Sequence, residues 1–396
     1  MGSVITDSNA NIRRRAQLKA YALIAPLALL LLLTFAIPLG FILTRSVSDP
    51  ELVETLPNLS GALAAWDGKS APPSSLLDAA RADLDQVEPQ KLAAVARRLS
   101  YEGSGFRSLL TSTKRKLKTD PATAFNDPLW QNRETWQAMK RAVGPVTDYF
   151  LLAAIDKKRD YQTGVQDSFN RSLYTGIMAR TFVMAIVVTV VCLFLAFPLC
   201  SYLARQYDRL RNILLLFVLL PFWTAALVRN TAWMIILQDR GAINQVLLSL
   251  GIIETPLSLM YNRGAVIVAM AHVMLPFMIF PLLASMRSVD QRLLMAASSL
   301  GAGPAMTFLK VYLPQIMPGV MAGSLMVFIV TLGFYITPAL LGGPADQMIS
   351  YYIAQFTTAT QNWGMAAALS VILLIATGLL YLLQTSLSRR FQGGAR

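Results

Sequence analysis

Long apolar runs alternate with polar stretches along the chain, and six of these runs are about 20 residues or longer. An α-helix needs about 20 consecutive apolar residues to cross a bilayer. None of the six contains Asp or Glu. They are Tyr21–Leu43, Ile177–Leu203, Ile213–Leu237, Ala265–Ser285, Val320–Leu341 and Ala366–Leu387. This pattern predicts an all-α membrane protein with six transmembrane helices.

The distribution of Lys and Arg predicts the orientation, because short cytoplasmic loops carry most of the positive charge. The first run follows a basic segment but lacks a small-residue cleavage site, so we expect a retained span with its N-terminus inside. The inside segments then hold 13 basic and three acidic residues, whereas the two short outer loops hold two basic and three acidic. Both termini are expected to be cytoplasmic. The inside basic residues are Arg13, Arg14, Arg15, Lys19, Arg205, Arg209, Arg211, Arg287, Arg292, Lys310, Arg389, Arg390 and Arg396.

A polar segment of about 130 residues separates the first two spans and carries 18 Lys and Arg and 16 Asp and Glu. Such a charged segment lies outside lipid, and long loops cross a membrane regardless of their charge. Helical spacing of apolar residues predicts a helix over Ser75–Arg98, interrupted at Pro89, and a second over Leu129–Ile155. We expect a small, mostly helical extracytoplasmic domain with a structural or docking role.

Composition excludes an ordinary soluble enzyme. Hydrophobic residues make up 55% of the chain and charged residues 14%, with a mean hydropathy of +0.49, whereas soluble domains carry about 25% charge. The net charge of +13 matches cytoplasmic loops better than a nucleic-acid partner, which we do not expect. Cys192 and Cys200 share one apolar run and His272 is the only histidine, so no disulfide framework, metal site or catalytic triad is predicted. His272 has two interpretations, helix packing or a polar lining of a pathway.

The connection between the fourth and fifth runs, Arg287–Pro318, is the most informative stretch. Small residues at 296–299 precede Gly301, and an apolar set with helical spacing ends at Leu313 and Pro314. The pattern predicts two short helices joined at a glycine. A reverse turn would need far fewer than about 30 residues. We therefore expect this elbow to dock into a groove of another protein.

The elbow resembles the EAA loop of ATP-binding-cassette importer permeases, whose pattern is Glu-Ala-Ala, three residues, Gly, nine residues, Ile, one residue, Leu-Pro. The matching positions are Ala296, Ala297, Gly301, Leu313 and Pro314, with Val311 in place of the isoleucine. Met295 replaces the glutamate, which puts in doubt any salt bridge through that position. The resemblance implies that these residues, Met295 included, couple the chain to an ATPase.

Two further stretches, Pro221–Leu247 and Leu332–Ser350, are similar to spermidine/putrescine importer permeases of the PotB type. With the elbow, they extend the resemblance from about Ile177 to the C-terminus, a little over half of the chain. The long insertion has no counterpart in shorter members. The resemblance implies a non-catalytic inner-membrane permease without a cofactor, which works with a second permease, an ATPase dimer and an extracytoplasmic substrate-binding protein.

Both stretches place unusual groups at membrane depth. Arg229 lies within an apolar run, where a guanidinium must snorkel, pair or face water. Pro221 and Pro338 interrupt helical hydrogen bonding, and freed carbonyls are tolerated only where they are buried or line a cavity. We interpret these groups as a lining of the translocation path, with structural kinks as the alternative. The candidate path residues are Trp223, Arg229, Asn230, Trp233, Tyr335 and Thr337.

The resemblance makes a polyamine the leading substrate, but the apolar runs lack the carboxylates that a polycation favours. Either the partner permease supplies acids, aromatic faces suffice, or the substrate is another small polar molecule, for example an amino-acid-like or opine-like compound. Two other classes remain open. A secondary transporter would normally show intramembrane carboxylates and an inverted repeat, and a membrane-anchored sensor would not need the elbow.

These predictions divide the chain into five parts. A cytoplasmic segment, 1–20, precedes the first transmembrane helix, 21–44. The extracytoplasmic inserted domain covers 45–176. A five-helix permease core covers 177–388, with its coupling elbow at 287–318, and a cytoplasmic tail covers 389–396.

Overall fold

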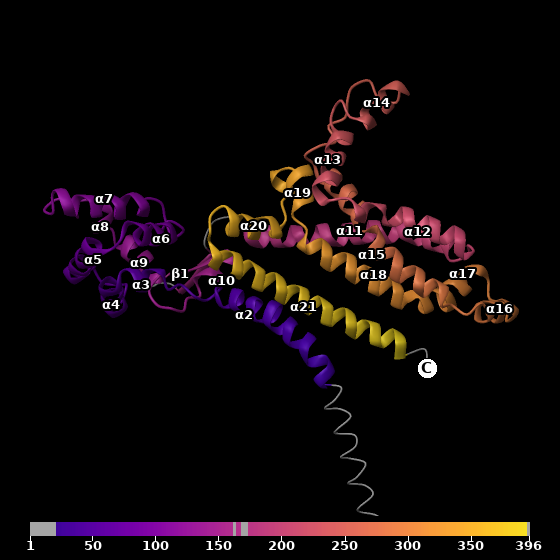
Figure 1. Ribbon diagram of the computed structural model, residues 1–396, viewed down its shortest axis with the longest axis horizontal. Helices are drawn as coiled ribbons and strands as arrows, with labels where there is room; N and C mark the ends of the chain where they lie inside the picture. Colours follow the sequence, from indigo (N-terminus) through magenta and orange to yellow (C-terminus); the bar gives the residue numbers. More distant parts are fainter. Residues whose placement is uncertain (1–20, 161–163, 168–172, 394–396) are drawn as a thin grey trace, which may run out of the picture. The chain divides into compact units, whose positions relative to one another are not determined.

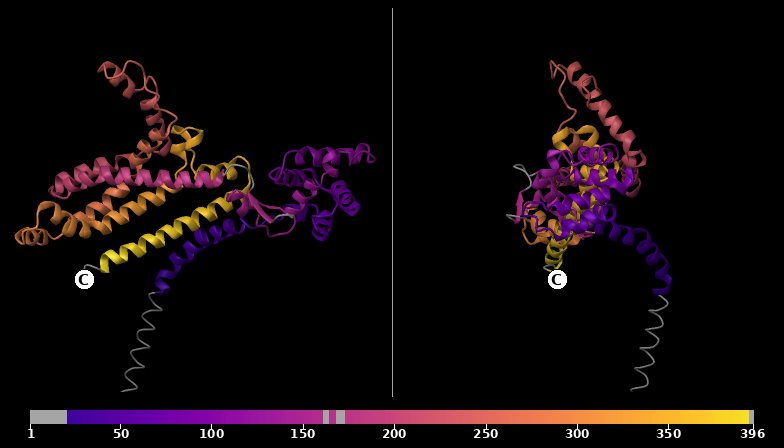
Figure 2. Two further views of the ribbon diagram at one scale, coloured as in Figure 1. Left: turned by 180° about the vertical axis from the view of Figure 1, so that it is seen from behind. Right: turned by 90° about the vertical axis from the view of Figure 1, so that its left-hand side faces the viewer.

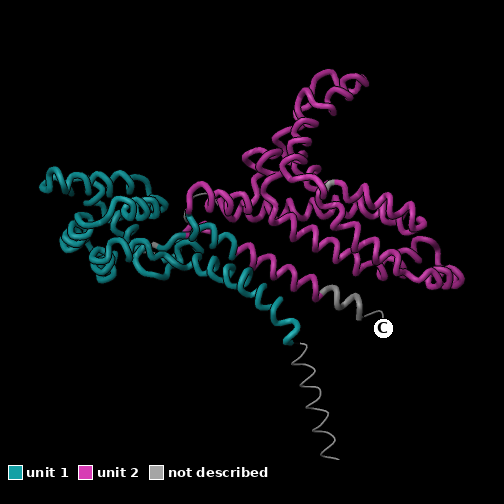
Figure 3. The backbone as a smooth tube through the Cα atoms, in the orientation of Figure 1, with its two compact units in different colours: residues 1–153, 158–166, 362–371 teal, residues 154–157, 167–361, 372–396 magenta. Residues whose placement is uncertain are grey.

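The computed structural model describes residues 21–160, 164–167 and 173–393. The basic segment 1–20 and the end of the tail, 394–396, which we expect in the cytoplasm, lie outside the described residues. The chain divides into two compact units (Figure 3). Unit 1 combines residues 1–153, 158–166 and 362–371, and unit 2 combines residues 154–157, 167–361 and 372–396.

Three long helices form the centre of unit 2: α11 (Tyr174–Leu203), α15 (Arg263–Arg287) and α18 (Leu313–Gly333) (Figure 1). The second and fourth predicted spans are confirmed by α11 and α15, which are long and apolar enough to cross a membrane. α15 packs against both other helices, and its methionines at 270, 274 and 278 are fully buried. The core of unit 2 therefore surrounds the fourth span.

Two glycines let α18 approach α15 closely. A methyl group at Gly319 would lie 2.3 Å from the Cβ atom of Ser285, and one at Gly323 would lie 2.9 Å from the sulfur of Met278. Their four-residue spacing places both glycines on one face of α18, as in other membrane helices whose backbones touch. Small side chains therefore determine how the fifth span packs on the fourth.

The third predicted span, Ile213–Leu237, is wrong as a single helix. It is divided between α12 (Asp208–Trp223) and α13 (Ala226–Leu237), with extended backbone at Thr224 and Ala225. Pro221 has no N–H with which to continue the helical hydrogen bonds, so α12 loses support near its end. α14 (Ala242–Ser249) follows α13 and projects away from the bundle of α11, α15 and α18 (Figures 1 and 2).

The fifth predicted span, Val320–Leu341, needs correction at both ends. A continuous helical segment runs from Pro304 to Gly333 and joins α17 (Pro304–Thr307), the π-helical turn η2 (Phe308–Tyr312) and α18. The wide turn of η2 ends shortly before Pro314 and accommodates its ring and missing N–H. Extended backbone at Phe334 then separates α18 from α19 (Ile336–Leu341). The second helix of the elbow is therefore the start of the fifth span.

The first and last predicted spans are confirmed as long apolar helices. The first runs from Tyr21 to Thr44 and contains η1 (Leu32–Ala36) and α2 (Ile37–Thr44). The last is α21 (Trp363–Gly393), and η3 (Pro344–Asp346) and α20 (Ile349–Thr358) precede it. Within the described ranges, five helices meet the length and composition of a membrane span. The broken helix α12–α13 occupies the remaining apolar run.

The insertion after the first span is mostly helical, as predicted. Its helices are α3 (Glu51–Thr55), α4 (Pro57–Ala65), α5 (Ser74–Gln86), α6 (Pro89–Leu99), α7 (Phe106–Thr119), α8 (Pro128–Gln131), α9 (Arg133–Arg141) and α10 (Tyr149–Ala154). Strands β1 (Lys157–Asp160) and β2 (Gly164–Asp167) form a small sheet. The interruption predicted at Pro89 is confirmed by the boundary between α5 and α6.

The single helix predicted over Leu129–Ile155 is wrong, because three helices share that range. Asn132 ends α8 and caps α9, its side chain accepting a hydrogen bond from the N–H of Glu134. After α9, Gly144 adopts a left-handed conformation (φ +112°) directly before Pro145. Caps and turn residues therefore divide a segment whose apolar spacing alone indicates one helix.

The helices of unit 1 enclose a hydrophobic core. Buried leucines from α4, α5, α6 and α7 contribute the largest group of its side chains. Trp130 and Trp136 pack with ring centroids 5.2 Å apart. Their indole N–H groups donate to the Thr113 hydroxyl and to the backbone carbonyl of Trp130. These tryptophans therefore pack the core with their polar atoms satisfied.

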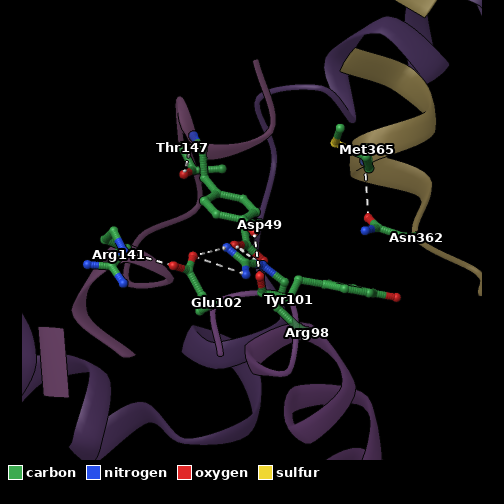
Figure 4. A network of polar contacts seen from close by, with 9 residues as sticks. Asp49, Arg98, Tyr101, Glu102, Arg141, Thr147, Asn362 and Met365 are labelled. Atoms are coloured by element: carbon green, nitrogen blue, oxygen red, sulfur yellow. Dashed lines mark hydrogen bonds and ion pairs between the residues drawn. The ribbon is translucent and has the colours of Figure 1, made fainter. Parts of the chain in front are cut away.

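A buried ionic network in unit 1 begins five residues after the first helix (Figure 4). Arg98 donates to Asp49 at 2.7 Å, and Glu102 accepts from Arg98 at 3.4 Å and from Arg141 at 2.8 Å. The Arg98 guanidinium also lies 4.2 Å from the centre of the Tyr149 ring. Burial raises the pKa of the Asp49 carboxyl, and the charge of Arg98 opposes that rise. The network therefore connects the end of the first span to helices α6 and α9 of the insertion.

Candidate translocation path and coupling elbow

Two interrupted helices meet in unit 2. α13 follows the break at Thr224–Ala225, α19 follows the break at Phe334–Tyr335, and the two short helices pack against each other. Unwound backbone at membrane depth is tolerated only where protein buries it or where it lines a cavity. The pairing of α13 with α19 therefore gathers most of the candidate path residues at one place.

A hydrogen bond between two candidate path residues holds this junction together. The hydroxyl of Thr337 donates to the side-chain oxygen of Asn230 at 2.9 Å. Thr337 is fully buried and Asn230 nearly so. A buried polar pair between spans satisfies both groups without water. The bond links the third apolar run to the fifth.

Arg229 occupies the break rather than the packed face of α13. Its guanidinium donates to the backbone carbonyl of Thr224 at 2.8 Å and lies 3.4 Å from the Thr224 hydroxyl. That carbonyl lies just after the end of α12, where helical acceptors lose their partners. The sequence left three possibilities for the Arg229 guanidinium: to snorkel, to pair or to face water. The structure shows it paired with a carbonyl at a helix end.

Trp233 brings the single histidine of the chain into the junction. Its indole N–H lies 3.4 Å from Nδ1 of His272 on α15, and the two rings meet edge to face at 5.7 Å. An acceptor Nδ1 places the imidazole proton on Nε2. His272 thus contacts a candidate path residue, so both packing and pathway interpretations remain compatible with its position.

The remaining two candidate path residues are more exposed. Tyr335 lies at the break before α19 with 43% of its surface exposed, and Trp223 at the end of α12 is 74% exposed. Neither makes the buried contacts of Asn230 and Thr337. The structure therefore gathers Arg229, Asn230, Trp233 and Thr337 around α13, and leaves Trp223 pointing away from the packed interior.

The loop after α19 contains a polar cluster that the sequence analysis did not identify. Arg180 on α11 donates to the carbonyls of Ala345 and Gln347. Asp346 accepts from Arg263 at 3.2 Å and from the N–H of Gly343. A methyl group at Gly342 would lie only 2.7 Å from the Pro338 carbonyl oxygen. The signal available in the sequence was Arg180 itself, a charge inside an apolar run.

The elbow turns at a glycine, as predicted. α16 (Gln291–Ser299) ends before Gly301, whose φ of +85° is left-handed. The N–H of Gly301 donates to the carbonyl of Ser298, and the N–H of Ala302 donates to that of Ala297, which closes the helix end. A methyl group at Gly301 would meet nothing within 4 Å. The backbone conformation alone therefore favours glycine here.

The exposed apolar surface of the elbow comes from α16, from the turn that follows it, and from the next helical turns, where Met306 and Leu309 are 51% and 59% exposed. Met295 and Leu300 are 61% and 89% exposed, and Ala296 is exposed beside Met295. Leu313, by contrast, lies at the start of α18 and packs against the core of unit 2. The sequence pattern therefore combines residues with two different environments, an exposed turn and the base of the fifth span.

Comparison with known proteins identifies the family. Residues 196–393 match the family described as binding-protein-dependent transport system inner membrane component. The spermidine/putrescine transport system permease protein PotB of Escherichia coli is 36% identical over 217 residues, which cover 55% of this chain and 79% of PotB. PotB of Haemophilus influenzae is 33% identical over 208 residues, covering 52% and 73%. The E. coli inner membrane ABC transporter permease protein YdcU is 33% identical over 268 residues, covering 63% and 79%.

The residues that match the family model include both the α13–α19 junction and the elbow. Membership of this family excludes the two alternative interpretations of the chain, a secondary transporter and a membrane-anchored sensor, because both belong to other classes of protein. It also implies work with another permease, an ATPase and a binding protein. The chain belongs to the binding-protein-dependent transport system inner membrane component family and is a multi-pass permease subunit of an ATP-binding-cassette importer, a transport subunit and not an enzyme.

Proposed function

We propose that this permease imports a polyamine such as spermidine or putrescine through a path that passes the α13–α19 junction. The observation that carries the proposal is the 36% identity to PotB proteins, which are named for spermidine and putrescine. Two interrupted spans with polar groups between them provide a route where backbone dipoles can replace water.

Aromatic rings are the protein groups best suited to a polyamine in this part of the chain. Trp233 borders the junction and Tyr335 stands exposed at the break before α19. An ammonium group over such a ring gains about 0.5 to 2 kcal/mol, depending on desolvation. Arg229 would repel the substrate, but its guanidinium is held by the Thr224 carbonyl. Carboxylates would come from the second permease, because the apolar runs contain none.

The elbow is the proposed site of ATPase coupling, through Met295, Ala296, Ala297 and Gly301 and the adjoining Leu313 and Pro314. Its exposed side chains include the apolar Leu293, Met295 and Leu300, which a helix that enters a groove would bury. The elbow and both termini would lie in the cytoplasm. The insertion 45–176 would lie outside, on the side of the substrate-binding protein.

The continuous helix that follows the elbow suggests how movement of the ATPases is transmitted to the translocation path. Residues 304–333 form one helical segment that starts at the elbow and ends at the break before α19. At 1.5 Å per residue it is about 45 Å long. ATP-driven closure of the ATPases would displace α16 and move this segment as a rigid body. Tyr335 and Thr337 would then shift relative to α13.

Uptake into proteoliposomes tests the proposal. The complex that copurifies with the chain is reconstituted with its binding protein, ATP and radiolabelled spermidine. ATP-dependent accumulation that unlabelled putrescine competes away, and that an amino acid does not, is the expected result. ATP-dependent uptake of an amino-acid-like or opine-like compound without spermidine uptake would support the alternative substrate, which the absence of carboxylates in the spans favours. Failure of any ATPase to copurify would contradict the coupling role.

A further inference from the structure

A cavity of about 1070 Å³ lies behind the elbow in unit 2, apart from the proposed path. Its walls come from the ends of α11 and α15 and from α16, α17 and η2. In Figure 1, α16 and α17 lie at the end of unit 2 where the 30-residue helix α11 finishes. The cavity therefore occupies the space between the elbow and the ends of two spans.

The charge of the cavity is positive. Arg205 from the turn after α11 and Arg287 from the end of α15 both line it, and no Asp or Glu is among its lining residues. Arg287 approaches Asp208 only to 3.9 Å, and Asp208 is highly exposed and already bonded to Arg211. Among the described residues, no ion pair joins Arg205 to a carboxylate. Within the described part of the chain, Arg205 therefore has no carboxylate partner and Arg287 has only this long pair, so both guanidinium groups keep N–H donors for an anion.

The rest of the wall mixes polar side chains with an apolar part, and the apolar part adjoins an exposed apolar face of α11. Phe197 and Phe308 line the cavity and meet edge to face at 6.1 Å. One turn before Phe197, Phe194 is 78% exposed on α11. Tyr202 and Tyr207, also exposed, flank the cavity end of the helix, where aromatic side chains mark the interface between lipid and water. These aromatic side chains favour headgroup depth for the cavity, with an apolar exit along α11.

We propose that this cavity binds an anionic phospholipid, with the headgroup phosphate between Arg205 and Arg287 and an acyl chain along Phe197 and the outer face of α11. Basic pockets at the ends of transmembrane helices bind anionic headgroups in this way. A free phosphate would use the two arginines but not the apolar wall. Because α16 and α17 form one side of the cavity, the lipid would contact both the elbow and α11.

Lipid retention by the purified complex tests the role of the arginines. A variant with Arg205→Gln and Arg287→Gln is compared with one carrying Arg209→Gln and Arg292→Gln, two exposed arginines that do not line the cavity. Both variants lose the same net charge. We expect native mass spectrometry to show phosphatidylglycerol bound at least about tenfold more weakly in the cavity variant than in the control, because charge-assisted bonds are lost. Equal affinities would overturn the proposal.

A second variant keeps both arginines but fills the cavity. Ser298→Trp places a large ring at an exposed position that lines the cavity, and Ser299→Trp, its exposed neighbour outside the lining, is the control. Ser298→Trp alone should release phosphatidylglycerol. Retention of the lipid by both tryptophan variants would contradict the assignment. Displacement of phosphatidylglycerol from the native complex by millimolar glycerol 3-phosphate would also contradict it and would identify a soluble anion as the occupant.

Discussion

The hydroxyl of Thr337 bonds to the side chain of Asn230 at 2.9 Å, across 107 positions of sequence and between two interrupted spans. The bond lies in the packed interior of unit 2, where water does not compete for either group. Any motion that carries α19 past α13 must break this bond or move both helices together. The pair therefore connects the stability of the junction with its movement.

Replacing Thr337 with valine removes the hydroxyl at nearly constant volume and leaves the Asn230 oxygen without this donor. We expect a loss of about 1 kcal/mol in the stability of the complex and altered substrate stimulation of ATP hydrolysis. Thermal unfolding and ATPase assays of the reconstituted complex measure both. Thr331→Val is the matched control, because Thr331 is fully buried and its hydroxyl has no hydrogen-bond partner among the described residues. An equal effect of the two substitutions would argue against a special role for the pair.

Gly301→Val should uncouple ATP hydrolysis from transport. A residue with a Cβ atom loses about 1 to 2 kcal/mol in the left-handed conformation of Gly301, and a β-branched residue loses more. The turn between α16 and α17 would therefore change. Gly303→Val is the control, because Gly303 has an ordinary φ of −65° and open space around it. Uptake and ATPase activity are measured together. Normal uptake by Gly301→Val would remove the turn from the coupling mechanism.

Arg98→Met should destabilise the insertion by about 3 to 5 kcal/mol, because it leaves Asp49 and Glu102 buried without their common partner. Arg115→Met, at an exposed position of α7, should cost little. Limited proteolysis of membranes, followed with an antibody to the insertion, compares the two. Equal resistance would show that the network in Figure 4 does not hold the insertion together.

Cysteine labelling in intact cells tests the orientation. Ser104 lies exposed in the insertion and Ser288 lies exposed after α15. A membrane-impermeant thiol reagent should label Ser104→Cys from outside and should label Ser288→Cys only after permeabilisation. The native Cys192 and Cys200 are buried, so background labelling of these two cysteines should be low. The reverse pattern would overturn the assignment of the termini to the cytoplasm.

Apolar run length predicted most of the spans, because a helix in lipid must satisfy its own backbone and so needs little from its neighbours. It failed where the chain departs from regular helix. The apolar run 213–237 does not show that the backbone is extended at Thr224, and the sequence around Pro314 does not show that a π-helical turn lets the helix continue. These outcomes depend on tertiary packing and on where each freed carbonyl finds a partner.

The sequence predicted which residue types form the candidate site, but it predicted only part of the contacts between them. Arg229 and Asn230 are conspicuous within an apolar run, and the structure gives each a partner. The link from Trp233 to His272 joins residues 39 positions apart, and no local pattern indicates it. Trp223 lies among apolar residues in the sequence, but its side chain is 74% exposed at the end of α12, which the local pattern does not indicate.

The central claim is that the breaks before α13 and α19 border an aqueous path, and the reactivity of a cysteine at Tyr335 tests it most directly. Tyr335→Cys, in a background with Cys192 and Cys200 replaced by alanine, is treated with a water-soluble thiol reagent in proteoliposomes. Phe194→Cys, on the exposed apolar face of α11, is the control for a side chain that faces lipid. The path predicts that Tyr335→Cys reacts, that spermidine slows the reaction, and that Phe194→Cys stays unmodified. If Tyr335→Cys is as inert as Phe194→Cys with and without ATP, the path does not pass this junction.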